Sequence, residues 1–129
     1  MISNSVPHSL RTWFIVHFIV DYIFGIPLMI APQWTLVQFG FNTTEALPPR
    51  LVAAAFLAIG GISFIARNHD AETYRALLFL KILWSLFAIL GIVITLIQGA
   101  PPFTFAVLIT FAVFSSVWLH YWIRMGCRI

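Results

Sequence analysis

Long uninterrupted apolar runs dominate the hydropathy pattern of this chain. Four of them stand out, at about residues 12–31, 51–66, 73–98 and 103–123. A bilayer core about 30 Å thick requires about 20 helical residues, so these lengths are typical of membrane-spanning helices. The second run is the shortest and is expected to cross with little tilt. The pattern therefore predicts an all-α polytopic membrane protein, with four transmembrane helices in a single bundle domain over residues 1–129.

Helix breakers and polar residues separate the four runs. Pro32 ends the first run, and Asp70 is placed to cap the N-terminus of the third. The segment Gly99-Ala-Pro-Pro102 breaks the chain before the fourth run. The first run carries Asp21 and lacks a small-residue cleavage site, so we expect it to remain as an anchor and not to be removed as a signal peptide.

Composition points to the same class of protein. The chain is 61% apolar and only 9% charged, whereas roughly a quarter of the residues of a soluble domain are charged. Seven Lys and Arg against four acids give a net charge of +3, but the basic residues are dispersed, which excludes a nucleic-acid surface. The single cysteine, Cys127, excludes an internal disulfide and is either an inert thiol or a palmitoylation site.

The basic residues predict the orientation in the membrane. With four spans, the N-terminus, the second connection and the C-terminus share one side. That side holds Arg11, Arg67, Arg75, Lys81, Arg124 and Arg128. The other side holds only Arg50. Because positive charge favours the cytoplasmic side, we expect both termini to be cytoplasmic.

The long outer connection, at about residues 32–49, contains Trp34, Phe39 and Phe41. It has two interpretations. One is a short helix lying in the membrane interface. The other, which we favour, is a loop that inserts its aromatic side chains into the top of the bundle.

Small residues mark the second run as the centre of helix packing. They let helices approach closely, where dispersion replaces the missing hydrophobic driving force. We expect packing at Ala54, Ala58, Gly60 and Gly61. This helix is therefore predicted either to be surrounded by the other three or to face a second subunit.

His17 and Asp21 are the candidate functional residues, because an ionisable group inside a membrane requires a partner or a role. They lie one turn apart and share a helix face. Lys81 and His120 reach similar depths from two other helices, which predicts a polar cluster opening toward the cytoplasm. Possible hydrogen-bond partners of this cluster are Ser85, Ser116 and Tyr22.

Plainer interpretations stand beside this one. Lys81 could extend its ammonium to the headgroups, and His120 could be a wet interfacial histidine. Asp21 could form a structural pair with Lys81 or His17 that only orients helices. No metal or haem is predicted, although His17 and His120 could in principle supply ligands, because cysteine pairs and dense histidine motifs are missing from the sequence.

Three segments resemble small four-helix membrane proteins of the DoxX-like group. They are Gly25-Ile-Pro-Leu-Met-Ile-Ala-Pro32, Phe39-Gly40 and Arg50-Leu-Val-Ala-Ala-Ala-Phe-Leu-Ala-Ile-Gly60-Gly61, with the basic Arg67 following. The resemblance covers roughly the first half of the chain and implies a four-helix bundle. Some DoxX-like proteins are membrane subunits associated with quinone-linked sulfur oxidation. The His17 and Asp21 pair is not carried over from that group.

These patterns favour an accessory or scaffold subunit of a membrane assembly, which forms a homo-oligomer or joins a larger complex. The alternative is a protein that handles protons or a small apolar ligand through the polar cluster. A third class is an enzyme acting on a lipid or quinone. We do not favour an enzyme, because the short connections leave little room for a soluble catalytic apparatus. The expected partners are the lipid bilayer and other membrane subunits, and not nucleic acid.

Overall fold

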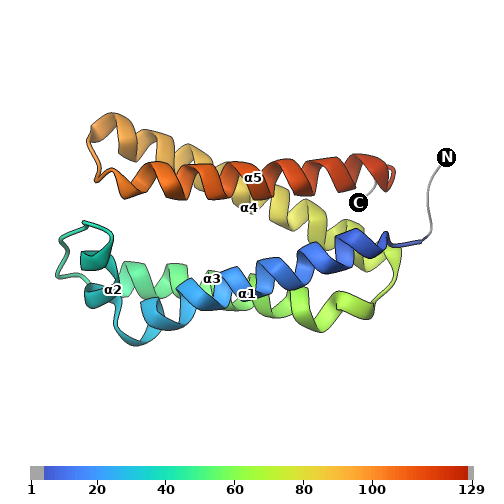
Figure 1. Cartoon of the computed structure of the whole chain (residues 1–129), viewed down its shortest axis with the longest axis horizontal. Coiled ribbons are helices and arrows are strands. Elements are labelled where there is room, and N and C mark those ends of the chain that lie inside the picture. The colour runs from blue at the N-terminus through green and yellow to red at the C-terminus, as the bar shows by residue number, and fades with distance from the viewer. Residues whose placement is uncertain (1–4, 128–129) are drawn as a thin grey trace. The chain divides into compact units, whose positions relative to one another are not determined.

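The computed structural model describes residues 5–127, which form five α-helices and one short 3-10 turn (Figure 1). They are α1 (His8–Ile30), α2 (Pro32–Gln38), α3 (Leu47–Ile65), η1 (Ala66–Asn68), α4 (Ala71–Gln98) and α5 (Phe103–Arg124). The predicted all-α class is confirmed. Four of these helices are long and apolar enough to cross a membrane, and α2 is an additional short helix. Arg128 lies outside the described residues.

Two of the long helices begin earlier than the apolar runs suggested. α1 starts at His8, and α3 starts at Leu47, which places Pro48 and Pro49 inside its first turn. Proline is tolerated there because the first N–H groups of a helix have no intrahelical acceptor. Counting apolar residues alone therefore missed the polar or proline-containing first turns.

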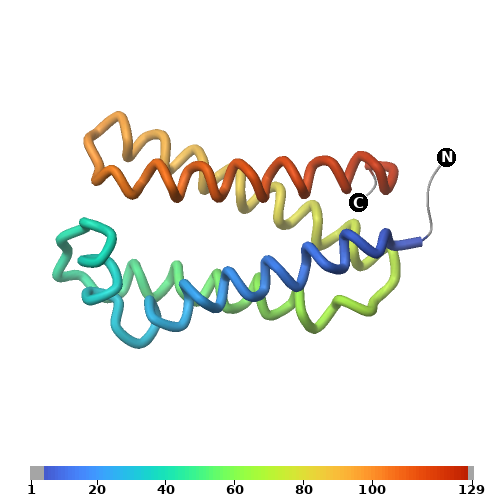
Figure 2. The backbone as a smooth tube through the Cα atoms, in the orientation of Figure 1, coloured from blue at the N-terminus to red at the C-terminus, as the bar shows by residue number. Residues whose placement is uncertain are grey.

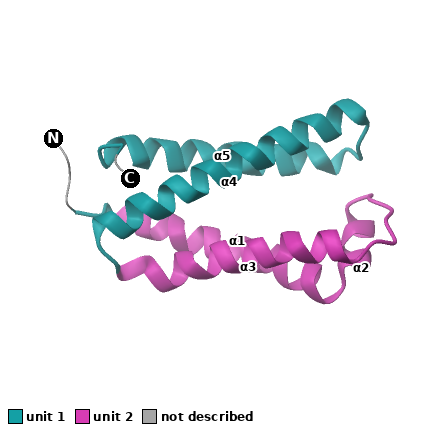
Figure 3. Ribbon diagram, turned by 180° about the vertical axis from the view of Figure 1, so that it is seen from behind, with its two compact units in different colours: residues 1–7, 69–129 teal, residues 8–68 magenta. Residues whose placement is uncertain are grey.

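The chain divides into two compact units (Figure 3). One unit, His8–Asn68, contains α1, α2, α3 and η1, and we call it the N-terminal unit. The C-terminal unit contains α4 and α5. Each is described by itself below.

In the N-terminal unit, α1 and α3 lie side by side and antiparallel (Figure 2). The Phe18 and Phe64 rings stack with centroids 4.7 Å apart. Toward the other end, Arg50 Nε donates to the carbonyl of Met29 at 3.1 Å. These contacts fix a register in which residue numbers rise along α1 as they fall along α3.

The connection between α1 and α3 forms the short helix α2. Trp34 is 64% exposed on it, whereas Thr35 is buried. Gln33 Nε2 ties the helix to the following segment through the carbonyl of Thr44, at 2.6 Å. The helical interpretation describes the backbone of this connection. Its aromatic side chains divide, since Trp34 is exposed whereas the Phe39 ring lies 6.1 Å from the Phe24 ring of α1. The location of α2 in a membrane interface stays a prediction.

In the C-terminal unit, α4 and α5 also pack antiparallel. Asp70 caps α4 as predicted, its carboxylate accepting the backbone N–H of Thr73 at 2.9 Å. The ring centroids of Phe79 and Trp122 are 5.7 Å apart. The buried Arg75 donates from Nε to the carbonyl of Met125 at 2.9 Å and so closes the end of α5.

Large apolar side chains are exposed on all four long helices. Strongly exposed examples are Ile30 of α1, Ile65 of α3, Phe87 and Ile97 of α4, and Ile109 of α5. A soluble protein seldom leaves this much apolar surface uncovered, whereas lipid chains solvate it without cost. The exposed faces therefore fit a protein whose solvent is largely the bilayer.

Candidate functional site

His17 and Asp21 form the centre of the candidate site, on one face of α1. His17 Nδ1 lies 3.5 Å from Asp21 Oδ2. Both side chains are buried, with 6% and 8% of the residue surface exposed. The separation is longer than a charge-assisted hydrogen bond, which is typically about 2.7–2.9 Å. The two groups are close enough to exchange a proton after a small side-chain rotation.

Gly60 of α3 makes the room that Asp21 occupies. A Cβ built on Gly60 would lie 2.6 Å from the Asp21 Cβ and 3.0 Å from its Oδ2. Real Cβ atoms do not approach this closely, so any larger residue at position 60 would push the helices apart. Glycine is therefore required at position 60 by the aspartate opposite it.

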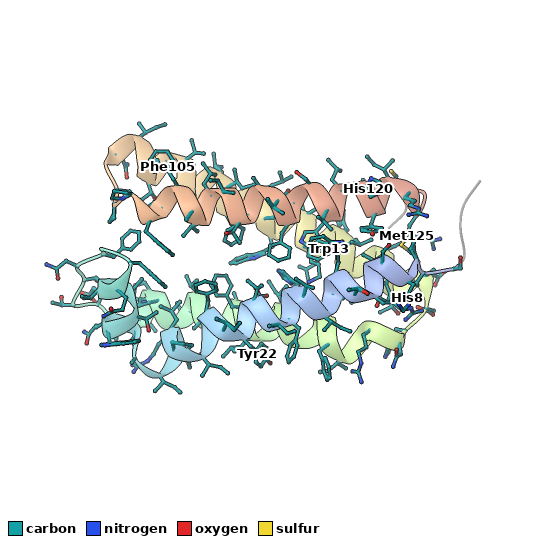
Figure 4. All side chains as sticks on the ribbon, in the orientation of Figure 1. His8, Trp13, Tyr22, Phe105, His120 and Met125 are labelled. Atoms are coloured by element: carbon teal, nitrogen blue, oxygen red, sulfur yellow. The ribbon has the colours of Figure 1, made fainter. Side chains whose placement is uncertain are left out.

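Tyr22 of α1 also lies against a glycine of α3, Gly61, next to the contact between Asp21 and Gly60. Tyr22, which lies midway along α1 (Figure 4), donates from its hydroxyl to the backbone carbonyl of Leu57 at 3.1 Å. A Cβ on Gly61 would lie 2.9 Å from that hydroxyl. The Tyr22 ring is also 4.5 Å from the Phe18 ring. Two consecutive polar residues of α1 thus face two consecutive glycines of α3.

Lys81 and Ser85 lie buried in the C-terminal unit, one turn apart on α4. Lys81 is 1% exposed, and its Nζ lies 5.0 Å from the centre of the Trp118 ring, a cation–π contact. The Ser85 hydroxyl donates to the carbonyl of Ile82 at 3.0 Å. Lys81 is therefore packed against an aromatic ring, and its ammonium does not extend to the surface of the chain.

The membership of His120 and Ser116 in the polar cluster stays a prediction. Both are exposed on α5, and the Ser116 hydroxyl is used within its own helix, donating to Ala112. His120 lies near the C-terminal end of α5 (Figure 4). Each is two residues from the buried Trp118, which is roughly 200° around the helix, so burying Trp118 turns both outward.

Of the four packing residues predicted on α3, two contact α1 and two are exposed. Gly60 and Gly61 contact α1 as expected, but Ala54 and Ala58 are exposed. The alanine that is fully buried is Ala53, seven residues before Gly60 and hence about two turns away on the same face. A spacing of seven residues before Gly60 would have identified Ala53 as a packing residue. The number of small residues in the segment did not identify it.

The chemistry that this arrangement allows is proton exchange between an imidazole and a carboxyl group, in surroundings with little water. Among residues 5–127, no three His, Cys, Asp or Glu side chains gather closely enough to hold a metal ion. Comparison of the chain with known protein families, with curated proteins and with solved structures finds no match.

Proposed function

We propose that the protein is an accessory or scaffold subunit of a membrane assembly, inserted with both termini on the cytoplasmic side. The observation that carries this proposal is the pairing of Asp21 with Gly60 and of Tyr22 with Gly61. It uses two polar residues midway along α1 to hold α1 against α3. The exposed apolar faces then remain for lipid and for neighbouring subunits, and the DoxX-like resemblance is compatible with such a role.

Native mass spectrometry of the mildly solubilised full-length protein tests the scaffold proposal, because it reports oligomers, partners and bound small molecules together. We expect the wild-type chain to retain a partner or a second copy. Asp21→Asn should reduce that retention, because it removes the carboxylate that lies beside His17 at the α1–α3 contact. Ser116→Ala is the matched control, since this hydroxyl is exposed and bonded within α5. A wild-type protein that is always a lone monomer would overturn the proposal.

The orientation can be tested with the natural cysteine. Cys127 is exposed and is the only cysteine of the chain, so no engineered probe is required. A membrane-impermeant maleimide should leave Cys127 unlabelled in intact cells and label it after permeabilisation. Labelling in intact cells would place the C-terminus outside.

Proton handling is the second candidate, favoured by the 3.5 Å separation of the buried His17 and Asp21 side chains. In proteoliposomes with an internal pH dye, this role requires a proton flux that Asp21→Asn abolishes while the thermal unfolding temperature is unchanged. The scaffold role requires the reverse outcome, with no flux in the wild type and a lower unfolding temperature in the variant. The two results cannot be confused.

A further inference from the structure

The short helix α2 presents its apolar side chains away from the rest of the N-terminal unit. Trp34 and Val37, three residues apart and therefore on one face, are 64% and 55% exposed. Pro32 and Thr35 lie roughly 200° around the helix from them, and both are buried. The helix thus buries a threonine and exposes a tryptophan. An exposed apolar face of this kind marks a contact with lipid or with another protein.

Hydrogen bonds at both ends of α2 fix the direction in which this face points. Near its start, Gln33 Nε2 donates to the carbonyl of Thr44 at 2.6 Å. At its end, the backbone N–H of Phe41 donates to the carbonyl of Leu36 at 3.0 Å, across Gly40 with its left-handed φ of 85°. A rotation of α2 that turned the tryptophan inward would have to break these bonds. The outward face is therefore a built feature of the connection.

Arg50 indicates the depth at which α2 lies in a membrane. It is exposed in the first turn of α3, and its Nε donates to the carbonyl of Met29, in the last turn of α1. A guanidinium is costly in the hydrocarbon core, so this end of both helices belongs near the headgroups. The exposed Glu45, just before α3, adds a second charge there. Figure 1 shows α2 at the same end of the unit, and it begins at Pro32, three residues after Met29.

The apolar surface of the two long helices continues to α2. Ile30, the last residue of α1, is 73% exposed, and Leu47, the first residue of α3, is 66% exposed. Apolar side chains and charged groups therefore occur together at this end of the unit. The boundary between acyl chains and headgroups accommodates both, and tryptophan is enriched there because its ring is apolar while its N–H requires an acceptor.

We propose that α2 lies in the boundary between the acyl chains and the headgroups of one leaflet, with Trp34 and Val37 in contact with lipid. A helix in this position buries its apolar face about 5–10 Å into the boundary and lies parallel to the membrane surface. The connection between α1 and α3 is then an anchor that sets how deeply the two helices insert. The inference is independent of the scaffold role and of the orientation, and it requires only that α1 and α3 span a membrane.

Fluorescence of the full-length protein in vesicles of brominated phosphatidylcholine tests this location, because bromine atoms quench a tryptophan that they contact. The chain has five tryptophans, so the signal of Trp34 is the difference between the wild type and Trp34→Phe. We expect a larger loss of this signal with bromines near the headgroup than with bromines near the chain end, and little loss with iodide in the water. Trp34→Tyr also removes the indole and replaces Trp34→Phe if that variant does not fold.

The matched control is the difference between the wild type and Trp118→Phe. Trp118 is 1% exposed, so its signal should lose less to bromine at either depth. Four outcomes would overturn the proposal. Quenching of Trp34 by iodide and not by bromine would place α2 in water, and stronger quenching by bromines near the chain end would place it in the hydrocarbon core. Quenching by neither would mean that another protein, such as a second copy of the chain, covers the helix. Quenching by bromine no greater than that of Trp118 would exclude contact with lipid.

Discussion

Replacing Gly60 by alanine tests whether the Asp21 contact sets the spacing of α1 and α3. The new Cβ would lie 2.6 Å from the Asp21 Cβ, an atom next to the backbone that no side-chain rotation can move away. The helices must therefore separate or bend locally. Gly91→Ala is the control, because Gly91 is also inside a long apolar helix but has nothing within 4 Å of the position of a Cβ.

The expected magnitude follows from two opposing effects. Alanine in place of glycine favours a helix by about 1 kcal/mol, and this gain applies to both variants. Overpacking a close contact costs about 1–3 kcal/mol, and this cost applies only at Gly60. The difference in the free energy of unfolding between the two variants thus isolates the packing cost. We expect Gly60→Ala to be less stable than Gly91→Ala by about 1–3 kcal/mol.

Thermal unfolding in one detergent, followed by circular dichroism, measures this difference. Repeating the Gly60→Ala substitution in the Asp21→Gly variant tests whether Asp21 is the source of the cost. In Asp21→Gly, the carboxyl group and the Cβ opposite position 60 are both removed, so Gly60→Ala should cost little there. The reasoning is refuted if Gly60→Ala behaves like Gly91→Ala in the wild-type background, or if its cost persists undiminished in Asp21→Gly.

Three further predictions use the same unfolding measurement. Tyr22→Phe removes the hydrogen bond to α3 and should lower the free energy of unfolding by about 0.6 kcal/mol, with helix content unchanged; no loss would mean that the bond is not formed. Arg75→Leu leaves the buried Met125 carbonyl without this donor and should cost about 1–3 kcal/mol, against a smaller cost for Arg50→Leu, whose exposed bond to Met29 water can replace. The hydrogen bonds from Thr73 hold the pKa of Asp70 below its ordinary value, so its stabilising effect is present above about pH 3.9 and is lost as the pH falls through the lower folded-state pKa. Asp70→Ala should remove that part of the acid dependence, and an unchanged pH profile would show that the cap contributes nothing.

The helical class and the four long apolar helices were predictable because long apolar runs have one stable solution in lipid, the α-helix. The cap at Asp70 was predictable for a local reason, since an aspartate before an apolar run satisfies the first free N–H groups. The early starts of α1 and α3 were not predictable from the apolar runs. The first turn of a helix tolerates polar residues and prolines, so a helix can begin before its apolar run does.

The candidate site was predictable only in part. Spacing along one helix placed His17 beside Asp21, because residues four apart share a face. Depth in the membrane suggested His120 as a further member, but depth does not determine the direction in which a side chain points. That direction depends on which face the helix buries, and on α5 the buried face carries Trp118. The partnership of Asp21 with Gly60 required the interhelical register, which no local pattern provides.

That register also governs how α1 can move along α3. A slide of one turn, about 5.4 Å, would carry Asp21 away from Gly60 and toward Phe56 or Phe64, the residues four before and four after it. Neither aromatic side chain leaves the gap that glycine leaves. A piston-like displacement of one helix past the other is therefore blocked in both directions. We therefore expect a displacement of α1 along its axis to move α3 with it.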